Sequence, residues 1–216
     1  MISVDFDFPD RPEILCIGAH CDDIEIGCSG TVLRLLDAHP DIHITWLILT
    51  GNADRQAEAK ASAINLIGAD RVELVFHGFR DGYLPYIGET VKEAFEEIKS
   101  RTDPHLILCH WEGDRHQDHR FISELTASTF RKNLILEYEI PKYDGDMGRP
   151  NVFVPITEDI LKKKISNLMR CYPSQVDKNW FDAETFTSLH RLRGVECGSD
   201  SRYAEGFYCR KMAFMK

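Results

Sequence analysis

The chain has 216 residues, of which 43% are hydrophobic and 28% are charged. This length suits one buried core and is short for two ordinary domains, so a single domain over residues 1–216 is expected. No apolar run approaches the roughly 18 residues of a membrane-spanning helix. The formal net charge of -9 disfavours a sequence-independent nucleic-acid binder, which needs a basic face. The expected partner is therefore a small molecule, with no nucleic acid and no membrane.

The N-terminal segment MISVDFDFPDRPE carries acids and lacks the basic head and apolar stretch of a signal peptide. The seven cysteines are scattered, and no C-x-x-C pair indicates a zinc ribbon or a redox site. Reduced, buried thiols of this kind are typical of cytoplasmic proteins. We therefore expect a cytoplasmic location, while the sequence leaves the oligomeric state open, a homo-oligomer included.

Short β-branched apolar runs alternate with amphipathic segments through the first two-thirds of the chain, which is typical of βαβ units. The expected strands are 14–19, 42–50, 72–76, 106–109 and 134–138, and the expected helices are 27–38, 54–67, 89–99 and 118–131. In the last third we expect helices at 160–169 and 183–192, a strand at 207–214 and a surface loop at 143–151. Continuous apolar strands such as ILCIGA predict a Rossmann-like α/β domain with a mostly parallel sheet flanked by helices.

Ionisable residues gather in four loops that follow the predicted strands: HCDDIE, TGNADR, HGFRDGYLPY and HWEGDRHQDHR. Open parallel sheets bind their ligands beyond the carboxyl ends of the strands. The functional site is therefore expected at this edge of the sheet.

The first loop places His20, Asp22 and Asp23 directly after the first strand, with Glu25 close behind. Ionisable groups crowded at a strand end repel one another unless a positive partner holds them, and a divalent cation would do so. An aspartate acting as the N-cap of the following helix is the other interpretation, which needs only one carboxylate. For this segment alone, both interpretations stay open.

The last loop contains His116, Asp118 and His119. At the start of a helix, residues three apart lie on one face, so the two histidines are expected to point into one cavity while Asp118 caps the helix or orients a histidine. A charged, exposed helix start uses the same residues, so this motif alone is weak evidence. Because both loops lie at one edge of the sheet, together they predict a metal site with three nitrogen or oxygen ligands and an open position for water. The nearby Cys21 and Cys28 are not needed as ligands.

The segments AHCDDIE and HQDH resemble the AHPDDE-like and HPDH-like motifs of the LmbE/PIG-L family of N-acetylglucosaminyl deacetylases. The resemblance extends to Arg55 and Glu58 in TGNADRQAEAKASAINLIGA, and to YPSQ, RG and AEGF in the last third. Cys21 and Gln117 replace the usual prolines, and the acid that follows the aspartate pair is displaced to Glu25. Asp114 stands where some members carry a tyrosine that helps to bind the oxyanion, so another group, such as Trp111, would supply that help.

The resemblance implies a role for each residue of the two motifs. Asp22 would be the general base, His116 would stabilise the oxyanion and protonate the leaving amine, and Asp118 would orient or tune His116. The metal would be zinc, although iron or cobalt suits the same ligands. The implied metal ligands are His20, Asp23 and His119.

Substrate contacts are expected from Arg55, Asp81 and Tyr83, and Tyr86 could line the same sugar site. A guanidinium near a strand end can hold a hydroxyl, carboxylate or phosphate, but an ion pair of Arg55 with Glu58 is an equal alternative. Aspartate and tyrosine suit the hydroxyls and faces of a sugar, although FRDGYLPY is also compatible with an ordinary packed loop. No role is expected for His77, His105, His110 and His190.

These observations predict a metal-dependent deacetylase that acts on an N-acetylglucosamine-type sugar derivative. One alternative is the same hydrolytic site acting on another acyl amide or a chitin oligomer. Another is a sugar-binding protein without turnover, which would have no need of Asp22 beside Asp23. A dinucleotide-dependent oxidoreductase is excluded, because AHCDDIEIG stands where a G-x-G-x-x-G turn would be.

Overall fold

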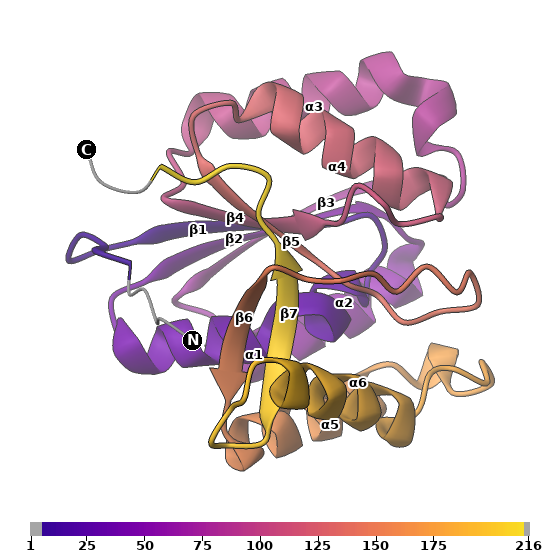
Figure 1. Cartoon of the computed structure of the whole chain (residues 1–216). Helices are drawn as coiled ribbons and strands as arrows, with labels where there is room; N and C mark the ends of the chain where they lie inside the picture. Colours follow the sequence, from indigo (N-terminus) through magenta and orange to yellow (C-terminus); the bar gives the residue numbers. More distant parts are fainter. Residues whose placement is uncertain (1–5, 214–216) are drawn as a thin grey trace.

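The computed structural model describes residues 6–213, which form one seven-stranded sheet in the order β3-β2-β1-β4-β5-β7-β6 (Figure 1). Neighbouring strands from β3 to β5 pair in parallel, whereas β7 is antiparallel to both β5 and β6. The predicted mostly parallel α/β fold is therefore confirmed. The strands are β1 (Glu13–Gly18), β2 (His43–Thr50), β3 (Val72–Phe79), β4 (Leu106–His110), β5 (Leu134–Tyr138), β6 (Val152–Ile156) and β7 (Tyr203–Tyr208).

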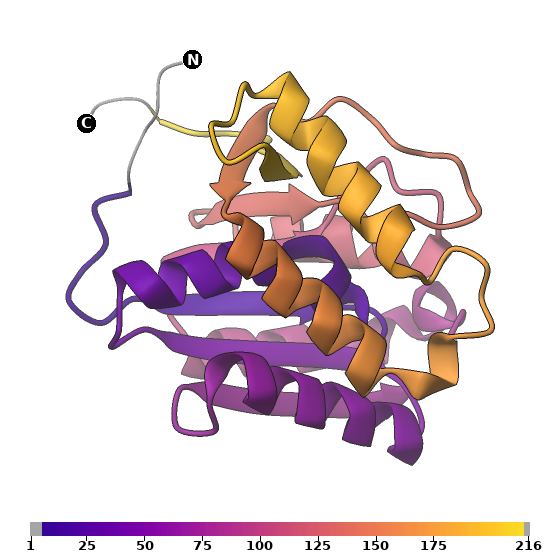
Figure 2. The same ribbon diagram turned by 90° about the horizontal axis from the view of Figure 1, so that it is seen from below.

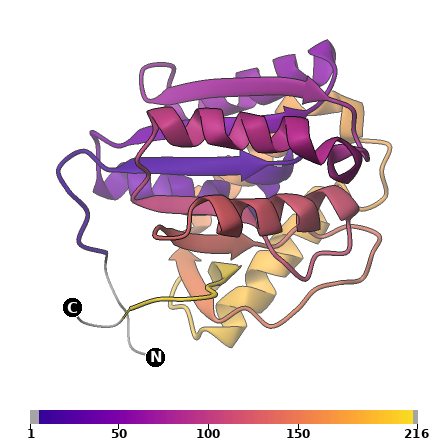
Figure 3. The same cartoon turned by 90° about the horizontal axis from the view of Figure 1, so that it is seen from above.

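Helices cover both faces of the sheet. One face carries α1, α2, α5 and α6, which lie in front of the sheet in Figure 2, and the other carries α3 and α4, which lie in front in Figure 3. Within residues 6–213, no helix has both the length and the apolar character needed to cross a membrane. The helices are α1 (Asp23–Ala38), α2 (Ala53–Ile67), α3 (Gly88–Arg101), α4 (Gln117–Thr129), α5 (Glu158–Cys171) and α6 (Ala183–Glu196), with short 3-10 turns at η1 (Leu84–Ile87) and η2 (Pro173–Gln175).

The central strand β1 shows why the sequence folds in this way. Successive side chains of a strand point to opposite faces. Ile14 and Cys16 enter the apolar cluster beneath α1, α2 and α5, while Leu15 and Ile17 enter the cluster beneath α3 and α4. A strand that is buried on both faces must be apolar at every position, which is how ILCIG reads.

The structure differs most from the prediction in the bounds of two elements and in one strand that was not predicted. Helix α1 begins at Asp23 rather than at residue 27, because Asp22 already occupies the N-cap position. Strand β6 was not predicted: it contains Pro155, which cannot donate a ladder hydrogen bond and is tolerated because β6 lies at the edge of the sheet. The final strand spans 203–208 instead of 207–214, and residue 214 lies outside the described residues.

A buried ionic cluster joins β7 and α5 to α1. Glu205 accepts hydrogen bonds from the Gly30 and Thr31 backbone N–H groups at 2.8 and 2.6 Å and from Lys164 Nζ at 2.6 Å. The Nζ atom of Lys164 also lies 2.8 Å from His190 Nε2, and the Lys164 side chain is fully buried. Burial alone would raise the pKa of the Glu205 carboxyl, but Lys164 and His190 lower that pKa to about 2. The last third of the chain is thus fixed to the core by charge as well as by apolar packing.

Candidate active site

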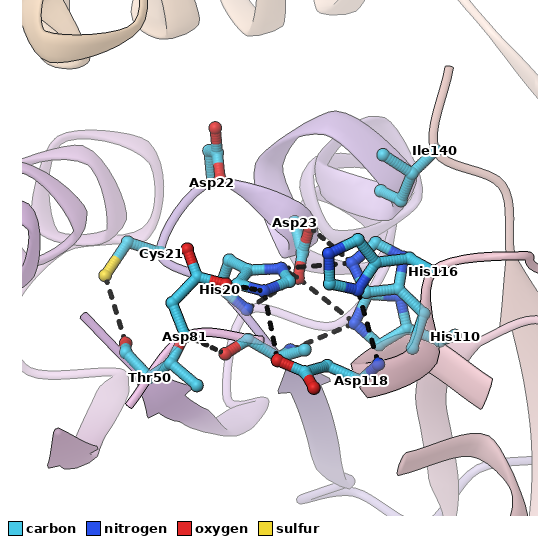
Figure 4. A network of polar contacts seen from close by, with 12 residues as sticks. His20, Cys21, Asp22, Asp23, Thr50, Asp81, His110, His116, Asp118 and Ile140 are labelled. Carbon is cyan, nitrogen blue, oxygen red and sulfur yellow. Dashed lines mark hydrogen bonds and ion pairs between the residues drawn. The ribbon is translucent and has the colours of Figure 1, made fainter. Parts of the chain in front are cut away.

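The site lies where the strand order changes direction. Strand β1 pairs with β2 on one side and with β4 on the other, so the loops after β1 and β4 meet at the carboxyl edge of the sheet. Such a switch point is where open α/β sheets bind ligands. The loop after β1 and the start of α1 carry His20, Asp22 and Asp23 (Figure 4). The loop after β4 and the first turn of α4 carry His116, Asp118 and His119. The predicted meeting of the two motifs is therefore confirmed.

Three potential metal donors lie close together. His20 Nδ1 is 3.0 Å from His119 Nε2 and 3.2 Å from Asp23 Oδ2, and His119 Nε2 is 3.5 Å from Asp23 Oδ1. Donors about 2.0–2.1 Å from a tetrahedral zinc ion lie about 3.3 Å from one another. Each pair of these predicted donors is therefore spaced as two ligands of one such ion would be, and the groups able to hold an ion also include His110, His116, Asp81 and Asp118.

Asp114 fixes the orientation of His119. The carboxylate Oδ2 of Asp114 lies 2.8 Å from His119 Nδ1, which leaves Nε2 facing the other donors. Burial and the adjacent His110 lower the pKa of His119 to about 3, so the ring is neutral at physiological pH, as a metal ligand must be. A carboxylate behind a ligating histidine is a common arrangement in metal sites, because it sets the tautomer and raises ligand basicity. Sequence reasoning noted Asp114 only as a departure from the family pattern.

His110 was expected to have no role, yet it packs directly against the donors. It is fully buried at the end of β4, and its ring stacks on that of His119 with centroids 3.9 Å apart. Its Nε2 atom accepts the Ala19 backbone N–H at 2.9 Å and lies 3.1 Å from Asp23 Oδ2. Since this nitrogen already accepts a hydrogen bond, His110 is a less suitable ligand than His20. It instead forms one wall of the donor cluster.

Asp22 and Asp23 are adjacent in sequence but differ in surroundings. Asp23 lies among the imidazoles, whereas the Asp22 side chain lies apart from them (Figure 4). Although Asp22 occupies the N-cap position of α1, its side chain makes no capping hydrogen bond. One oxygen, Oδ1, is 3.0 Å from Arg55 Nη2, and the other, Oδ2, is buried without a hydrogen-bond partner among the described residues. Burial raises the pKa of Asp22, and Arg55 opposes that rise.

Arg55 is held by acidic and hydroxyl partners. Its Nη1 atom lies 3.0 Å from Glu58 Oε2 and donates to Ser174 Oγ at 3.0 Å. Glu58 in turn accepts the Ser174 backbone N–H at 3.0 Å. The alternative ion pair with Glu58 is therefore present, together with the pair to Asp22. Arg55 still lines the cavity, so a contact with substrate stays a prediction.

His116 and Asp118 lie on the other side of the donor cluster. His116 is the N-cap of α4, and its Nδ1 accepts the Asp118 backbone N–H at 3.3 Å, so Asp118 does not cap the helix. Burial and the nearby His20 lower the pKa of His116, and the charges of Asp23 and Asp118 oppose this. The Asp118 carboxylate accepts the Gly82 backbone N–H at 2.8 Å and lies 3.5 Å from His20 Nε2. Its close imidazole contact is thus with a metal donor rather than with the His116 ring.

The donor cluster opens into a cavity of about 680 Å³. Asp81 lines it and lies 3.0 Å from His20 Nε2, whereas Tyr83 is 41% exposed and is not part of the lining. Trp111 stacks on Tyr208 with centroids 4.3 Å apart and is also outside the lining. Cys21 lines the cavity, but burial raises the pKa of its thiol to about 12, so it is neutral and a poor metal ligand.

The model of one protein family, described as PIG-L, GlcNAc-PI de-N-acetylase, matches residues 15–130. The chain belongs to the PIG-L family. The matched span is more than half of the chain and contains both motifs. This PIG-L chain is 29% identical over 174 residues to the uncharacterized deacetylase YaiS of Escherichia coli, with 74% of the chain and 90% of the relative covered. It is 27% identical over 233 residues to diacetylchitobiose deacetylase of Thermococcus kodakarensis, with 92% and 83% covered.

Solved structures share the PIG-L fold. One is an N,N'-diacetylchitobiose deacetylase from Pyrococcus horikoshii, with a TM-score of 0.73, 23% identity, and coverage of 91% of this chain and 83% of that one. Another is GalB, a 4-carboxy-2-hydroxymuconate hydratase from Pseudomonas putida, with a TM-score of 0.76, 18% identity, and coverage of 95% and 98%. Because a hydratase shares the fold with deacetylases, the reaction must be argued from the side chains of the site.

Proposed function

We propose that this protein is a metal-dependent deacetylase that hydrolyses the N-acetyl group of an N-acetylglucosamine-type sugar derivative. The observation that carries the proposal is that the side chains of the two adjacent aspartates have different surroundings. Asp23 lies among the imidazole donors, while Asp22 has one oxygen paired with Arg55 and the other without a hydrogen-bond partner within residues 6–213. Metal-dependent amide hydrolysis uses both metal ligands and a free base, and a protein that only binds sugar needs no such pair.

His20, Asp23 and His119 would hold the metal, with zinc as the first choice and iron or cobalt as alternatives. When bound there, the ion polarises the acyl oxygen and lowers the pKa of a water towards ~7. Asp114 keeps His119 aimed at this position through its 2.8 Å contact with Nδ1. Near His20, the Asp81 and Asp118 carboxylates lie 3.0 and 3.5 Å from Nε2, so they would act on this ring through charge and not through a hydrogen bond.

Asp22 accepts the proton of the attacking water at Oδ2. Arg55 holds Oδ1 and prevents the carboxylate from rotating into the donor cluster. A base must be ionised to act, and the guanidinium counteracts the burial that would otherwise keep this carboxyl protonated. Arg55 is therefore a positioning residue for the base in this proposal, in addition to any contact with substrate.

His116 protonates the nitrogen that leaves. Its ring lies edge-to-face with that of His20, with centroids 4.8 Å apart, so it faces the reacting centre from the side opposite Asp22. In the neutral ring Nδ1 accepts the Asp118 backbone N–H, so the single ring proton is on Nε2. To act as an acid the ring must first gain a proton at Nδ1, which replaces the hydrogen bond to the Asp118 backbone, and Nε2 then gives its proton to the leaving amine. The same protonated ring would stabilise the oxyanion, and the charges of Asp23 and Asp118 favour that protonation.

The test is a substrate panel with metal-loaded protein: N-acetylglucosamine, N,N'-diacetylchitobiose and a non-sugar acetamide. We expect the two sugars to yield acetate and free amine in equal amounts, and Asp22→Asn with the same metal content to be nearly inactive. If only the non-sugar amide yields acetate, the substrate is another acyl amide and not an N-acetyl sugar. Fully metal-loaded protein that binds the sugars but releases no acetate would support a binding protein instead.

A further inference from the structure

The side chain proposed as the base has few restraints of its own. Asp22 occupies the N-cap position of α1 but makes no capping hydrogen bond. Within residues 6–213, Oδ1 is paired with Arg55 and Oδ2 has no hydrogen-bond partner. The direction of this carboxylate therefore depends on two things: what fixes the backbone beside it, and what fixes the guanidinium that holds Oδ1.

Tyr172, the C-cap residue of α5, contacts both of these supports. Its hydroxyl donates to the Cys21 carbonyl oxygen at 2.7 Å, and this carbonyl directly precedes Asp22. The Cζ atom of Arg55 lies over the Tyr172 ring, 5.4 Å from the centroid, which is within the range of about 6 Å for cation–π contacts. The Tyr172 side chain is fully buried, and its ring packs edge-to-face on Phe181. Close packing fixes the ring in one orientation.

Glu25 decides the direction of the hydrogen bond from Tyr172. Its Oε1 atom lies 2.5 Å from the same hydroxyl, and a phenol has only one proton to donate. Burial raises the pKa of Glu25 to about 8, so at neutral pH this carboxyl carries a proton and donates it to the Tyr172 oxygen. The phenolic proton is then left for the Cys21 carbonyl.

We propose that Tyr172 is a positioning residue for Asp22, because it holds both the carbonyl that precedes this base and the guanidinium that binds it. The proposal rests on the proposed function. Neither hydrogen bond of Tyr172 involves the donors His20, Asp23 and His119. Loss of the hydroxyl should therefore slow the reaction without weakening the metal. A tyrosine that served only the core would stabilise the fold and have no particular connection with the base.

Tyr172→Phe removes the hydroxyl and keeps the ring beneath Arg55. With metal-loaded protein and an N-acetyl sugar as substrate, kcat should fall about tenfold, because a small displacement of a reacting group is costly. KM, and the metal affinity measured by competition with a chelator, should change less than about twofold. Tyr208→Phe is the matched control, because the Tyr208 hydroxyl also lies beside a carboxyl, 3.2 Å from Glu139 Oε1, but outside the cavity lining.

The same substitution in Asp22→Asn separates positioning of the base from general damage to the site. If Tyr172 acts through Asp22, adding Tyr172→Phe to Asp22→Asn should lower the residual kcat by less than about twofold. A tenfold loss that persists in full in this background would overturn the proposal. So would a kcat of Tyr172→Phe equal to that of the parent.

Hydrogen exchange tests the link to the backbone without turnover. The amides of residues 19–26 should exchange faster in Tyr172→Phe than in the parent, and at the parent rate in Tyr208→Phe. The two proposals fail separately. A parent that releases no acetate refutes the deacetylase; faster exchange would then still support the hold of Tyr172 on the segment that carries Asp22, whereas unchanged exchange would refute that hold as well.

Discussion

Replacement of Glu205 by Gln removes one charge from the buried cluster that joins β7 and α5 to α1. The side chain keeps its size, but Lys164 loses its anionic partner in a position where neither residue is more than 2% exposed. The pKa of Glu205 is about 2 against an ordinary value of 4.5. At 1.36 kcal/mol per pKa unit, this difference corresponds to about 3 kcal/mol. The same size, about 3–5 kcal/mol, is typical when one partner of a buried ion pair is removed.

The effect depends on pH in a defined direction. Because the pKa of this carboxyl is lower in the folded protein than in the unfolded chain, the stabilisation is complete above pH 4.5 and is lost as the pH falls towards 2. Urea unfolding followed by circular dichroism should thus show Glu205→Gln to be about 3 kcal/mol less stable than the parent at pH 7. More than half of this difference should vanish by about pH 3.

Glu158→Gln provides the control, because Glu158 pairs with Lys162 at the surface and no resolvable change is expected. If Glu205→Gln unfolds at the same urea concentration as the parent at pH 7, the cluster does not stabilise the fold. A full-sized difference that persists unchanged from pH 7 to pH 3 would show that lost packing, and not charge, is responsible.

Three further substitutions test the site and its support. Asp22→Asn should keep the metal and lose roughly two to four orders of magnitude in turnover, while Asp23→Asn should lose metal and recover part of its activity in excess metal; identical metal titrations would refute this division of roles. Asp114→Asn should weaken metal affinity about 10–100-fold, as measured by competition with a chelator, and unchanged affinity would contradict its orienting role. Gly27→Ala should lower the free energy of unfolding by about 1–3 kcal/mol or more, because the new Cβ would lie 2.2 Å from a buried tyrosine ring; a stable variant would show that this ring can move.

The sequence predicted the donor cluster because each motif sits directly after a strand. Once β1 and β4 are recognised as parallel strands, the positions of His20 and His119 follow from the sheet. The predicted spans of the first five strands agree closely with the structure for the same reason, since each is an apolar run between polar segments.

The partners of these residues could not be predicted in this way. Asp114 contacts His119 because the loop after β4 folds back, and Arg55 reaches Asp22 because α2 lies beside α1. Neither contact leaves a periodic pattern in the chain. His110 was overlooked because it ends an apolar run, where a buried histidine is ordinarily a core residue. The strand with Pro155 was missed because its edge position is a property of the assembled sheet.

The hydrogen bonds of Ser174 link Arg55, which holds the proposed base Asp22, to a segment that contributes Gln175 and Trp180 to the cavity lining. Ser174 touches both Arg55 and Glu58, and the chain then continues through Gln175 to Trp180. In the proposed mechanism, residues that hold the base and residues that line the cavity are therefore connected to each other. A graft of residues 173–182 from a relative with another preference would also alter what holds the base in place. Substitutions at the two ends of this connection are then expected to be non-additive, so selection for a new substrate acts on rate and recognition together.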